Sequence, residues 1–316
     1  MKRLLIFLLQ LSLGTSILVL TLFSSSAFPW GTATHAFIDH NLGKRYGLVN
    51  INEIYGGISM DIFNALYWDQ GPARGVHSEF MKVWTEAKRQ TEKALAFGFI
   101  SHNELWGADF TAHCQSLTSG KDEGYVISKA RLLGELLAQE PAYQALNLPN
   151  EITLEFAHYS VEGGIDLLIR RKDPFVGRKI IFAAKERSSD FPLLLVRAYA
   201  QDFAAYFGSY PEAVMSIFHA EEKFRNSIIL YGLALSQTEN LALDLIAQYM
   251  AKQAGEFLTA YGIALPEGAD LKAVMKFALE KSIAICAEDF DQEISATISF
   301  VDQQLEAHGI SYRHRL

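Results

Sequence analysis

The chain has 316 residues, of which 50% are hydrophobic and 20% are charged, and its formal net charge is −8 at pH 7. This composition excludes an intrinsically disordered chain, because it supplies enough apolar surface to offset the entropy lost on folding. The negative charge excludes a broad basic face for nucleic acid. The only two cysteines, Cys114 and Cys286, exclude a disulfide-stapled scaffold and a four-thiolate zinc site. Nine histidines and the carboxylates remain as candidate metal ligands.

The N-terminal residues have the pattern of a secretory signal peptide. Two basic residues follow Met1, residues 4–23 carry no charge, and Ser25 and Ala27 satisfy the small-residue rule for cleavage. We therefore expect residues 1–27 to be a signal peptide and the mature chain to be exported, as a secreted or periplasmic protein. An apolar run of this length also suffices to span a bilayer, so an uncleaved membrane anchor over residues 4–23 is the alternative.

The remaining residues, 28–316, are predicted to form one all-α domain. Apolar residues recur at spacings of three and four, alternating strand-like runs are nearly absent, and no low-complexity linker divides the chain. The clearest helical patterns cover Val126–Gln139, Ala242–Leu258, Leu271–Ile285 and Ile294–Leu305. Turn-forming residues predict breaks near Gly71, Ser119, Pro141, Pro149, Asp173, Ser209 and Leu265.

Two segments place histidine and acid at helical spacing. In Ser101–Cys114, His102, Asp109 and His113 are separated by seven and four residues, so a continuous helix would align them on one stripe. In the other segment, His158 and Glu162 are one turn apart, and an aspartate follows one turn further on. Imidazole and carboxylate at this spacing suit zinc, which takes both in open catalytic sites.

Other residues are interpreted without a metal. A single histidine near an acid is more often a solvated helix pair than a ligand. We expect Trp106 and Phe110 to be core residues. Cys114 is predicted to be a small buried apolar residue, although a metal ligand or a disulfide partner of Cys286 are alternatives. The solvated interpretation is kept for His40, His219, His308 and His314.

In order and residue type, the candidate ligands resemble the bacterial zinc-dependent phospholipase C family, which shares its fold and three-zinc site with the fungal single-strand-specific nucleases. The pattern of that family begins with Trp followed shortly by His, and then has Asp after a small-residue turn and a further His. Next comes a helix that carries His, Asp and His, and the pattern ends with His and an acid one turn apart. The matching residues, all within 30–166, are Trp30, His35, Asp61, His77, His102, Asp109, His113, His158 and Glu162.

The resemblance implies up to three zinc ions in an all-α domain of that type. The first ion would be held by Asp61, His77, His102 and Asp109. The second would be held by His113, His158 and Glu162. The third would take His35 with the amine and carbonyl of Trp30, and Asp109 would bridge to it from the first.

The resemblance also implies an activity. A zinc-bound water would attack the phosphorus of a phospholipid, which would release diacylglycerol and the phosphorylated headgroup. Asp61 is either the general base of this reaction or a metal ligand only.

Two departures from the family pattern concern the middle of the chain. The family has Asp four residues after the first His of its helix, where this chain has Trp106, so Asp109 can replace it only with a helical bulge or a shifted register. The separation of His113 from His158 is longer than in the family, so the pair formed by His158 and Glu162 could also be coincidental.

A third departure concerns the N-terminus. Cleavage after Ala27 would leave Phe28 and Pro29 ahead of Trp30, and an amine within a peptide bond cannot bind zinc. Either a dipeptide is then removed, or cleavage falls after Pro29, or the third zinc is weak or missing.

The substrate is indicated less directly. Phe63, Tyr67 and Trp68 could contact a lipid surface, a choline headgroup or a stacked base, and core packing is an equal alternative. Ile62 stands where choline-specific lipases often have an aromatic residue, which disfavours a choline preference. Few basic residues lie near the motifs, so we expect no stable nucleic-acid partner.

We therefore predict a zinc-dependent phospholipase C-like phosphodiesterase that acts on a phospholipid or another phosphodiester and contacts a membrane surface. One alternative is a single-strand-specific nuclease or 3′-nucleotidase that uses the same zinc cluster. The other is a non-catalytic helical envelope protein anchored through residues 4–23.

Overall fold

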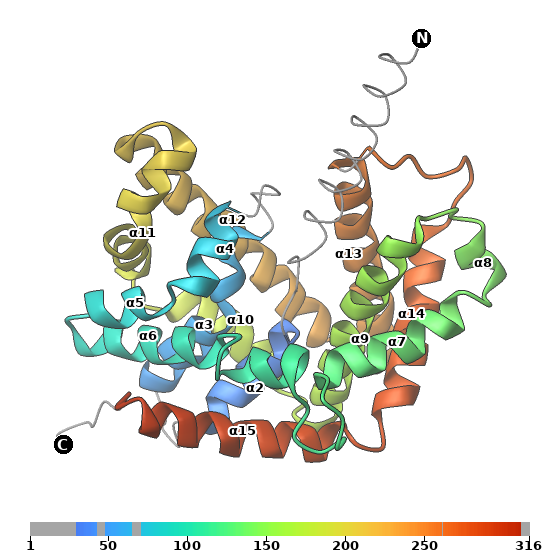
Figure 1. Cartoon of the computed structure of the whole chain (residues 1–316), viewed down its shortest axis with the longest axis horizontal. Helices are drawn as coiled ribbons and strands as arrows, with labels where there is room; N and C mark the ends of the chain where they lie inside the picture. The colour runs from blue at the N-terminus through green and yellow to red at the C-terminus, as the bar shows by residue number, and fades with distance from the viewer. Residues whose placement is uncertain (1–29, 43–47, 65–70, 261, 311–316) are drawn as a thin grey trace, which may run out of the picture.

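The structure is a computed structural model that describes residues 30–42, 48–64, 71–260 and 262–310. These residues form helices and no β-strand, which confirms the predicted all-α class (Figure 1). The predicted signal peptide, its cleavage site and the anchor alternative lie outside the described residues, as do Tyr67, Trp68 and His314. Among the described helices, none has the combined length and hydrophobicity needed to cross a bilayer.

Short helices make up most of the first half of the chain, and longer ones follow. The first half contains α2 (Thr32–Leu42), α3 (Leu48–Ile58), the 3₁₀ turn η1 (Met60–Phe63), α4 (Gly71–Ser78), α5 (Met81–Glu86), α6 (Gln90–His102), the π-helical turn η2 (Phe110–Cys114), α7 (Tyr125–Leu137), α8 (Pro141–Gln144) and α9 (Asn150–Lys172). The second half contains α10 (Val176–Glu186), α11 (Phe191–Phe207), α12 (Tyr210–Leu235), α13 (Glu239–Ala260), α14 (Leu271–Cys286) and α15 (Phe290–Ala307).

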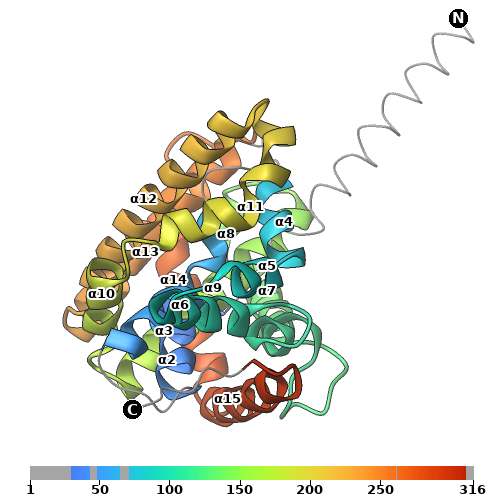
Figure 2. The same cartoon turned by 90° about the vertical axis from the view of Figure 1, so that its left-hand side faces the viewer.

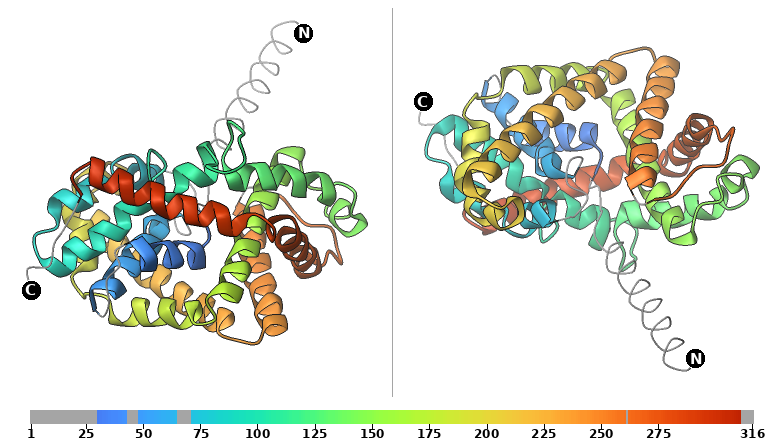
Figure 3. Two further views of the ribbon diagram at one scale, coloured as in Figure 1. Left: turned by 90° about the horizontal axis from the view of Figure 1, so that it is seen from below. Right: turned by 90° about the horizontal axis from the view of Figure 1, so that it is seen from above.

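The helices pack as two groups that meet at α2. In one group α3 packs on α6 and α10, and α12 lies along α10 and α11 (Figure 2). In the other, α9 packs on α7 and α14, and α14 packs on α13. Helix α2 contacts both α3 and α9, and α15 crosses beneath it (Figure 3). Residues on α2, α6 and α9 are thereby brought to the boundary between the groups.

Close packing fixes the register of α9 against its neighbours. A Cβ atom on Gly163 would lie 2.6 Å from the Met250 sulfur, and one on Gly164 would lie 2.5 Å from the Ser282 Cβ. Glycine at both positions therefore lets α13 and α14 approach α9 closely. This packing determines which face of α9 points toward α2.

Most predicted helices are confirmed, and the predicted breaks fall at or between helix ends. The four strongest periodic patterns correspond to α7, α13, α14 and α15. The single stripe predicted over Ser101–Cys114 is wrong, because α6 ends at His102. The side chain of Asn103 accepts hydrogen bonds from the backbone N–H groups of Leu105 and Trp106, which turns the chain out of the helix.

The two cysteines are not paired with each other. Both are free, Cys286 is buried and Cys114 is exposed. The prediction that Cys114 is buried is therefore wrong, because the last residue of η2 faces outward. Trp106 is partly buried and packs on Phe80 and His308, as expected for a residue at the edge of the core.

Candidate metal centre

Eight of the nine predicted ligand side chains lie in one connected cluster at the boundary between the two helix groups. They come from α2, η1, α4, α6, η2 with the residue before it, and α9. Three sets of side chains in this cluster have ligand atoms within 4.8 Å of one another. They are His35 with His102 and Asp109, His113 with His158 and Glu162, and His77 with Glu104 and Asp109.

Asp109 occupies the centre of the first set. Its Oδ1 lies 3.2 Å from His35 Nε2, and its Oδ2 lies 2.9 Å from His102 Nε2. The two imidazole rings stack with centroids 3.8 Å apart. One carboxylate thus faces two histidines through different oxygens, which is the arrangement expected of a bridging ligand.

Asp61 and His77 extend this set toward solvent. Asp61 Oδ1 lies 3.4 Å from His77 Nε2, and its Oδ2 lies 3.8 Å from His102 Nε2. On the other side of its ring, His102 Nδ1 is 2.6 Å from the carbonyl oxygen of Gly57. A carbonyl acceptor at Nδ1 fixes the tautomer and leaves Nε2 to face the carboxylates, as in many metal-binding histidines.

The second set is built mainly on α9. His158 Nε2 lies 2.8 Å from Glu162 Oε1, one helical turn further along, and 3.2 Å from His113 Nε2. The long separation of His113 and His158 in sequence is taken up by α7 and α8. The structure therefore brings His158 and Glu162 into the cluster with His113.

A π-helical turn connects Asp109 to His113. Asp109 immediately precedes η2, whose wider turn ends at Cys114. The connection from α6 requires glycine at position 107, because a Cβ there would lie 2.5 Å from the Ser101 carbonyl oxygen. The predicted bulge or shifted register is thus present as a break and a π turn.

The side chain of Trp30 lies beneath the cluster. Its indole Nε1 donates to the carbonyl oxygen of Ala108 at 2.9 Å and lies 3.1 Å from Thr111 Oγ1. The indole is 1% exposed. The predicted coordination by the amine and carbonyl of Trp30 stays a prediction.

Asp166 holds the start of α2 in place from α9. Its carboxylate accepts hydrogen bonds from the backbone N–H groups of Ala33 and Thr34 at 2.9 and 2.8 Å, and from the hydroxyl of Tyr231 at 2.8 Å. These bonds satisfy N–H groups that a helix N-terminus leaves unpaired. They fix His35, which follows Thr34, against the cluster.

The cluster contains buried polar atoms that make no well-aligned hydrogen bond, although several of them face another ligand atom at 2.8–3.2 Å. These atoms include both ring nitrogens of His35, Nε2 of His102, both carboxylate oxygens of Asp109 and Oε1 of Glu162. Buried polar groups are usually hydrogen-bonded, so such a concentration requires an explanation. Imidazole and carboxylate are zinc ligands, and metal ions bound here would satisfy these atoms. The residues present therefore fit a metal site.

Burial and mutual electrostatics perturb the titration of the same residues. Burial and the neighbouring His102 lower the pKa of His35 to about 4. Burial opposes a charge on His102, but the carboxylates of Asp109 and Asp61 outweigh it and raise its pKa to about 9. Burial and the carboxylates of Asp61 and Asp109 hold the pKa of Glu162 well above its usual range. Bound cations would balance these buried carboxylates.

Glu104 belongs to the cluster although the sequence did not identify it. It lies in the turn after α6, and its Oε1 is 3.6 Å from His113 Nδ1. Its position two residues after His102 gives no helical spacing to a histidine, so the periodicity contained no signal for it. Only the turn that ends α6 directs it inward.

A pocket of about 530 Å³ opens directly onto the cluster. His35, Asp61 and Glu162 form part of its wall, and most of the rest is formed by α9, α12 and α13. The wall is mostly apolar and aromatic, and includes Phe156, Tyr159, Phe224, Tyr249 and Phe257. A concave, largely apolar pocket with a few convergent polar groups is typical of a small-molecule site.

The remaining candidate residues lie apart from the cluster. Phe63 is fully buried and packs edge-on against Phe203, so it is a core residue. His40 Nδ1 lies 2.7 Å from Asn50 Oδ1, and His308 stacks on Trp106. His219 is exposed on α12, as predicted for a solvated histidine.

Comparisons of this chain with protein-family models, with curated proteins and with solved structures give no match. The family assignment therefore stays a prediction that rests on the residues of the cluster.

Proposed function

We propose that this protein is a zinc-dependent phosphodiester hydrolase of the phospholipase C type. The observation that carries the proposal is that a cluster of histidines and carboxylates with unsatisfied buried atoms forms one end of a largely apolar pocket. The cluster supplies imidazole and carboxylate ligands that suit zinc, and the pocket offers an apolar surface for the rest of the substrate.

We propose the three zinc positions that the resemblance implies. Asp61, His77, His102 and Asp109 would hold one ion, His113, His158 and Glu162 a second, and His35 with Asp109 and Trp30 a third. Bound zinc would neutralise phosphoryl oxygens and make a water molecule nucleophilic near neutral pH.

The side chains around the metal positions would orient the reactants. Asp61 is 18% exposed and lines the pocket. Of the two carboxylates at the first metal position, Asp61 and Asp109, it is therefore the one that reaches the substrate space. Asn64 donates a hydrogen bond to Asp61 Oδ1 at 2.7 Å and fixes the direction of this carboxylate. We propose that Asp61 accepts the proton from the attacking water, in addition to its ligand role.

The pocket favours a phospholipid over a single-stranded nucleic acid. Aromatic side chains of α9, α12 and α13 line it and would contact the acylglycerol part of a lipid. Its basic lining residues are Lys223 and Lys252, and Lys252 forms an ion pair with Glu256 at 2.7 Å. This wall lacks the continuous basic groove that a nucleic-acid backbone would need.

The activity can be tested by assaying the zinc-loaded protein on phosphatidylcholine vesicles and on single-stranded DNA side by side. We expect diacylglycerol and a phosphorylated headgroup from the vesicles, and loss of this activity in Asp61→Ala and His113→Ala. His219→Ala removes an exposed histidine outside the cluster and should leave the activity unchanged. Release of 5′-mononucleotides would favour the nuclease alternative, and a zinc-loaded protein inert on both substrates would contradict the proposal.

We also propose that the chain is exported after removal of residues 1–27, that it contacts a membrane surface, and that its third zinc position fills only after Phe28 and Pro29 have also been removed. The third zinc position requires a free amine at Trp30, so N-terminal sequencing and zinc analysis of the same secreted sample test both points. A chain that begins at Trp30 should contain three zinc ions. Retention of residues 4–23 would favour the anchored alternative.

A further inference from the structure

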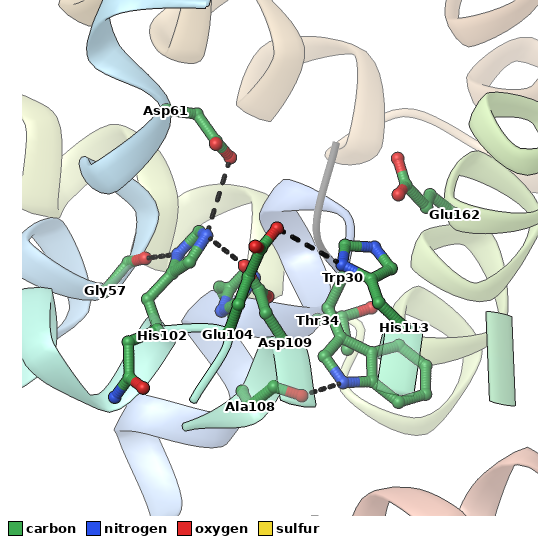
Figure 4. Close-up of polar contacts among 12 residues, drawn as sticks. Trp30, Thr34, Gly57, Asp61, His102, Glu104, Ala108, Asp109, His113 and Glu162 are labelled. Atoms are coloured by element: carbon green, nitrogen blue, oxygen red, sulfur yellow. Dashed lines mark hydrogen bonds and ion pairs between the residues drawn. The ribbon is translucent and has the colours of Figure 1, made fainter. Parts of the chain in front are cut away.

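Glu104 is the carboxylate of the cluster that is not among the nine predicted ligands. It lies between His102 and His113 (Figure 4). One of its oxygens is 3.6 Å from His113 Nδ1. Its carboxylate also has an oxygen within 4.8 Å of ligand atoms of His77 and Asp109. Glu104 therefore contacts the space of both the first and the second metal positions.

Buried ligand atoms surround Glu104. Asp109 is completely buried, and its two carboxylate oxygens face His35 Nε2 at 3.2 Å and His102 Nε2 at 2.9 Å without a well-aligned hydrogen bond. The Nδ1 atom of His77 is also buried without a hydrogen bond. Ligand atoms of His77, Glu104 and Asp109 meet at one space, and no hydrogen bond joins the three side chains. A bound cation would satisfy this arrangement.

The local backbone holds Glu104 in this position. Asn103 ends α6 and its side chain caps the two residues after Glu104. The turn therefore has a fixed shape, although the Glu104 side chain itself is 41% exposed. A carboxylate placed by a rigid turn and open to solvent can move the short distance needed to bind an ion.

We propose that Glu104 is an additional ligand of the first metal position and links it to the second through His113. The inference rests on the proposed zinc cluster and adds to it a residue outside the family pattern described above. The proposed link would couple the affinities of the two positions for zinc. The chemical class of the ligand is a divalent cation, and the probe is zinc alone.

The test is a zinc titration against a chromophoric chelator, carried out on purified protein without substrate. In the His158→Ala background the second position is dismantled, so an effect of Glu104→Gln must act through the first position or through net charge. We expect Glu104→Gln to weaken the remaining zinc affinity by at least about tenfold in this background. Glu155→Gln is the control, because Glu155 lines the pocket next to the cluster and belongs to none of the three ligand sets. Burial raises the pKa of Glu155 to about 7, so both variants are titrated at pH 8, where its carboxylate is charged.

The outcomes separate this inference from the proposed function. A tenfold loss with Glu104→Gln and less than about twofold with Glu155→Gln supports a ligand role. Equal effects of the two variants, or no effect of Glu104→Gln, would overturn the ligand role of Glu104. The proposed zinc cluster would still stand in that case, provided that the wild-type protein binds zinc. If the wild-type protein binds no zinc, both this inference and the proposed function fail. A cobalt absorption spectrum that is changed by Glu104→Gln and unchanged by Glu155→Gln provides a second readout, independent of affinity.

Discussion

The first and second proposed metal positions are built in different ways. The second takes two of its three residues from neighbouring turns of α9, where His158 and Glu162 contact each other at 2.8 Å. The first takes its residues from separate elements: Asp61 from η1, His77 from α4, His102 from α6, and Asp109 from the residue before η2. The second position is therefore largely a property of one helix, whereas the first exists only when several elements are packed.

The difference has a consequence for stability. Helix α9 is 23 residues long, and its backbone hydrogen bonds form whether or not a metal is present. The elements of the first position are short, and η1 has only four residues. Metal binding at the first position should therefore hold separate segments together, while binding at the second should add little to an existing helix.

The largest expected effect comes from removing the residue that the first and third positions share. Asp109→Asn should reduce the zinc content by two ions and abolish hydrolysis, because Asp109 faces both His35 and His102. The metal-free variant should also lose about 3 kcal/mol of unfolding free energy, since a buried charged partner is removed. Glu162→Gln should lose only the second ion. Metal analysis and denaturant unfolding provide the two measurements.

Equal zinc losses in Asp109→Asn and Glu162→Gln would show that Asp109 is not shared between positions. The exposed acid Asp122 provides a control for the change in charge. Asp122→Asn should retain the wild-type zinc content and stability.

For each site, a smaller effect is expected when zinc is removed from the wild-type protein. Chelation should lower the unfolding free energy. The loss should be about 2.7 kcal/mol for each site at which the free zinc concentration had been 100 times the Kd. Amide hydrogen exchange should then increase mainly in α2, η1, α4 and α6, and much less in α9. A uniform increase, or one concentrated in α9, would contradict the distinction between the two positions.

The same distinction explains which parts could be predicted from sequence. The all-α class and α7, α13, α14 and α15 were predictable, because local periodicity determines a helix. The pair of His158 and Glu162 was predictable from spacing alone. The family pattern supplied the order of the remaining ligands. No local pattern could show that Asp61 and His77 lie 3.4 Å apart, because tertiary packing brings them together.

The break between His102 and Asp109 was the main error of the helical periodicity. The spacing of seven and four residues fitted a continuous helix, but Asn103 offers the backbone a side-chain acceptor that ends α6. Glu104 entered the cluster through this same turn. The pocket could not be predicted either, since its walls come from α9, α12 and α13.

The smallest expected effect concerns the start of α6, the helix that carries His102 to the first position. Glu92 is buried at the start of this helix, and its carboxylate accepts hydrogen bonds from the backbone N–H groups of Lys88 and Arg89 at 2.8 and 3.0 Å. Arg197 donates to the other oxygen at 2.7 Å. No side chain caps α9 in this way, because Pro149 precedes it. The helix of the first position thus depends on a cap that the helix of the second does without.

Glu92→Gln should therefore destabilise the protein at pH 7 by about 1–2 kcal/mol and leave the second position intact. Burial opposes the charge on Glu92, but the hydrogen bonds from Arg89, Lys88 and Arg197 outweigh it and lower its pKa from 4.5 to about 2. A depressed pKa stabilises the folded state above the unfolded value and loses this contribution as the pH falls from about 4.5 to 2. The difference in unfolding free energy between wild type and Glu92→Gln should shrink over that range, as measured by urea denaturation at successive pH values. A difference that is constant with pH would show that the ionised carboxylate is not what supports α6 and, through it, the position of His102.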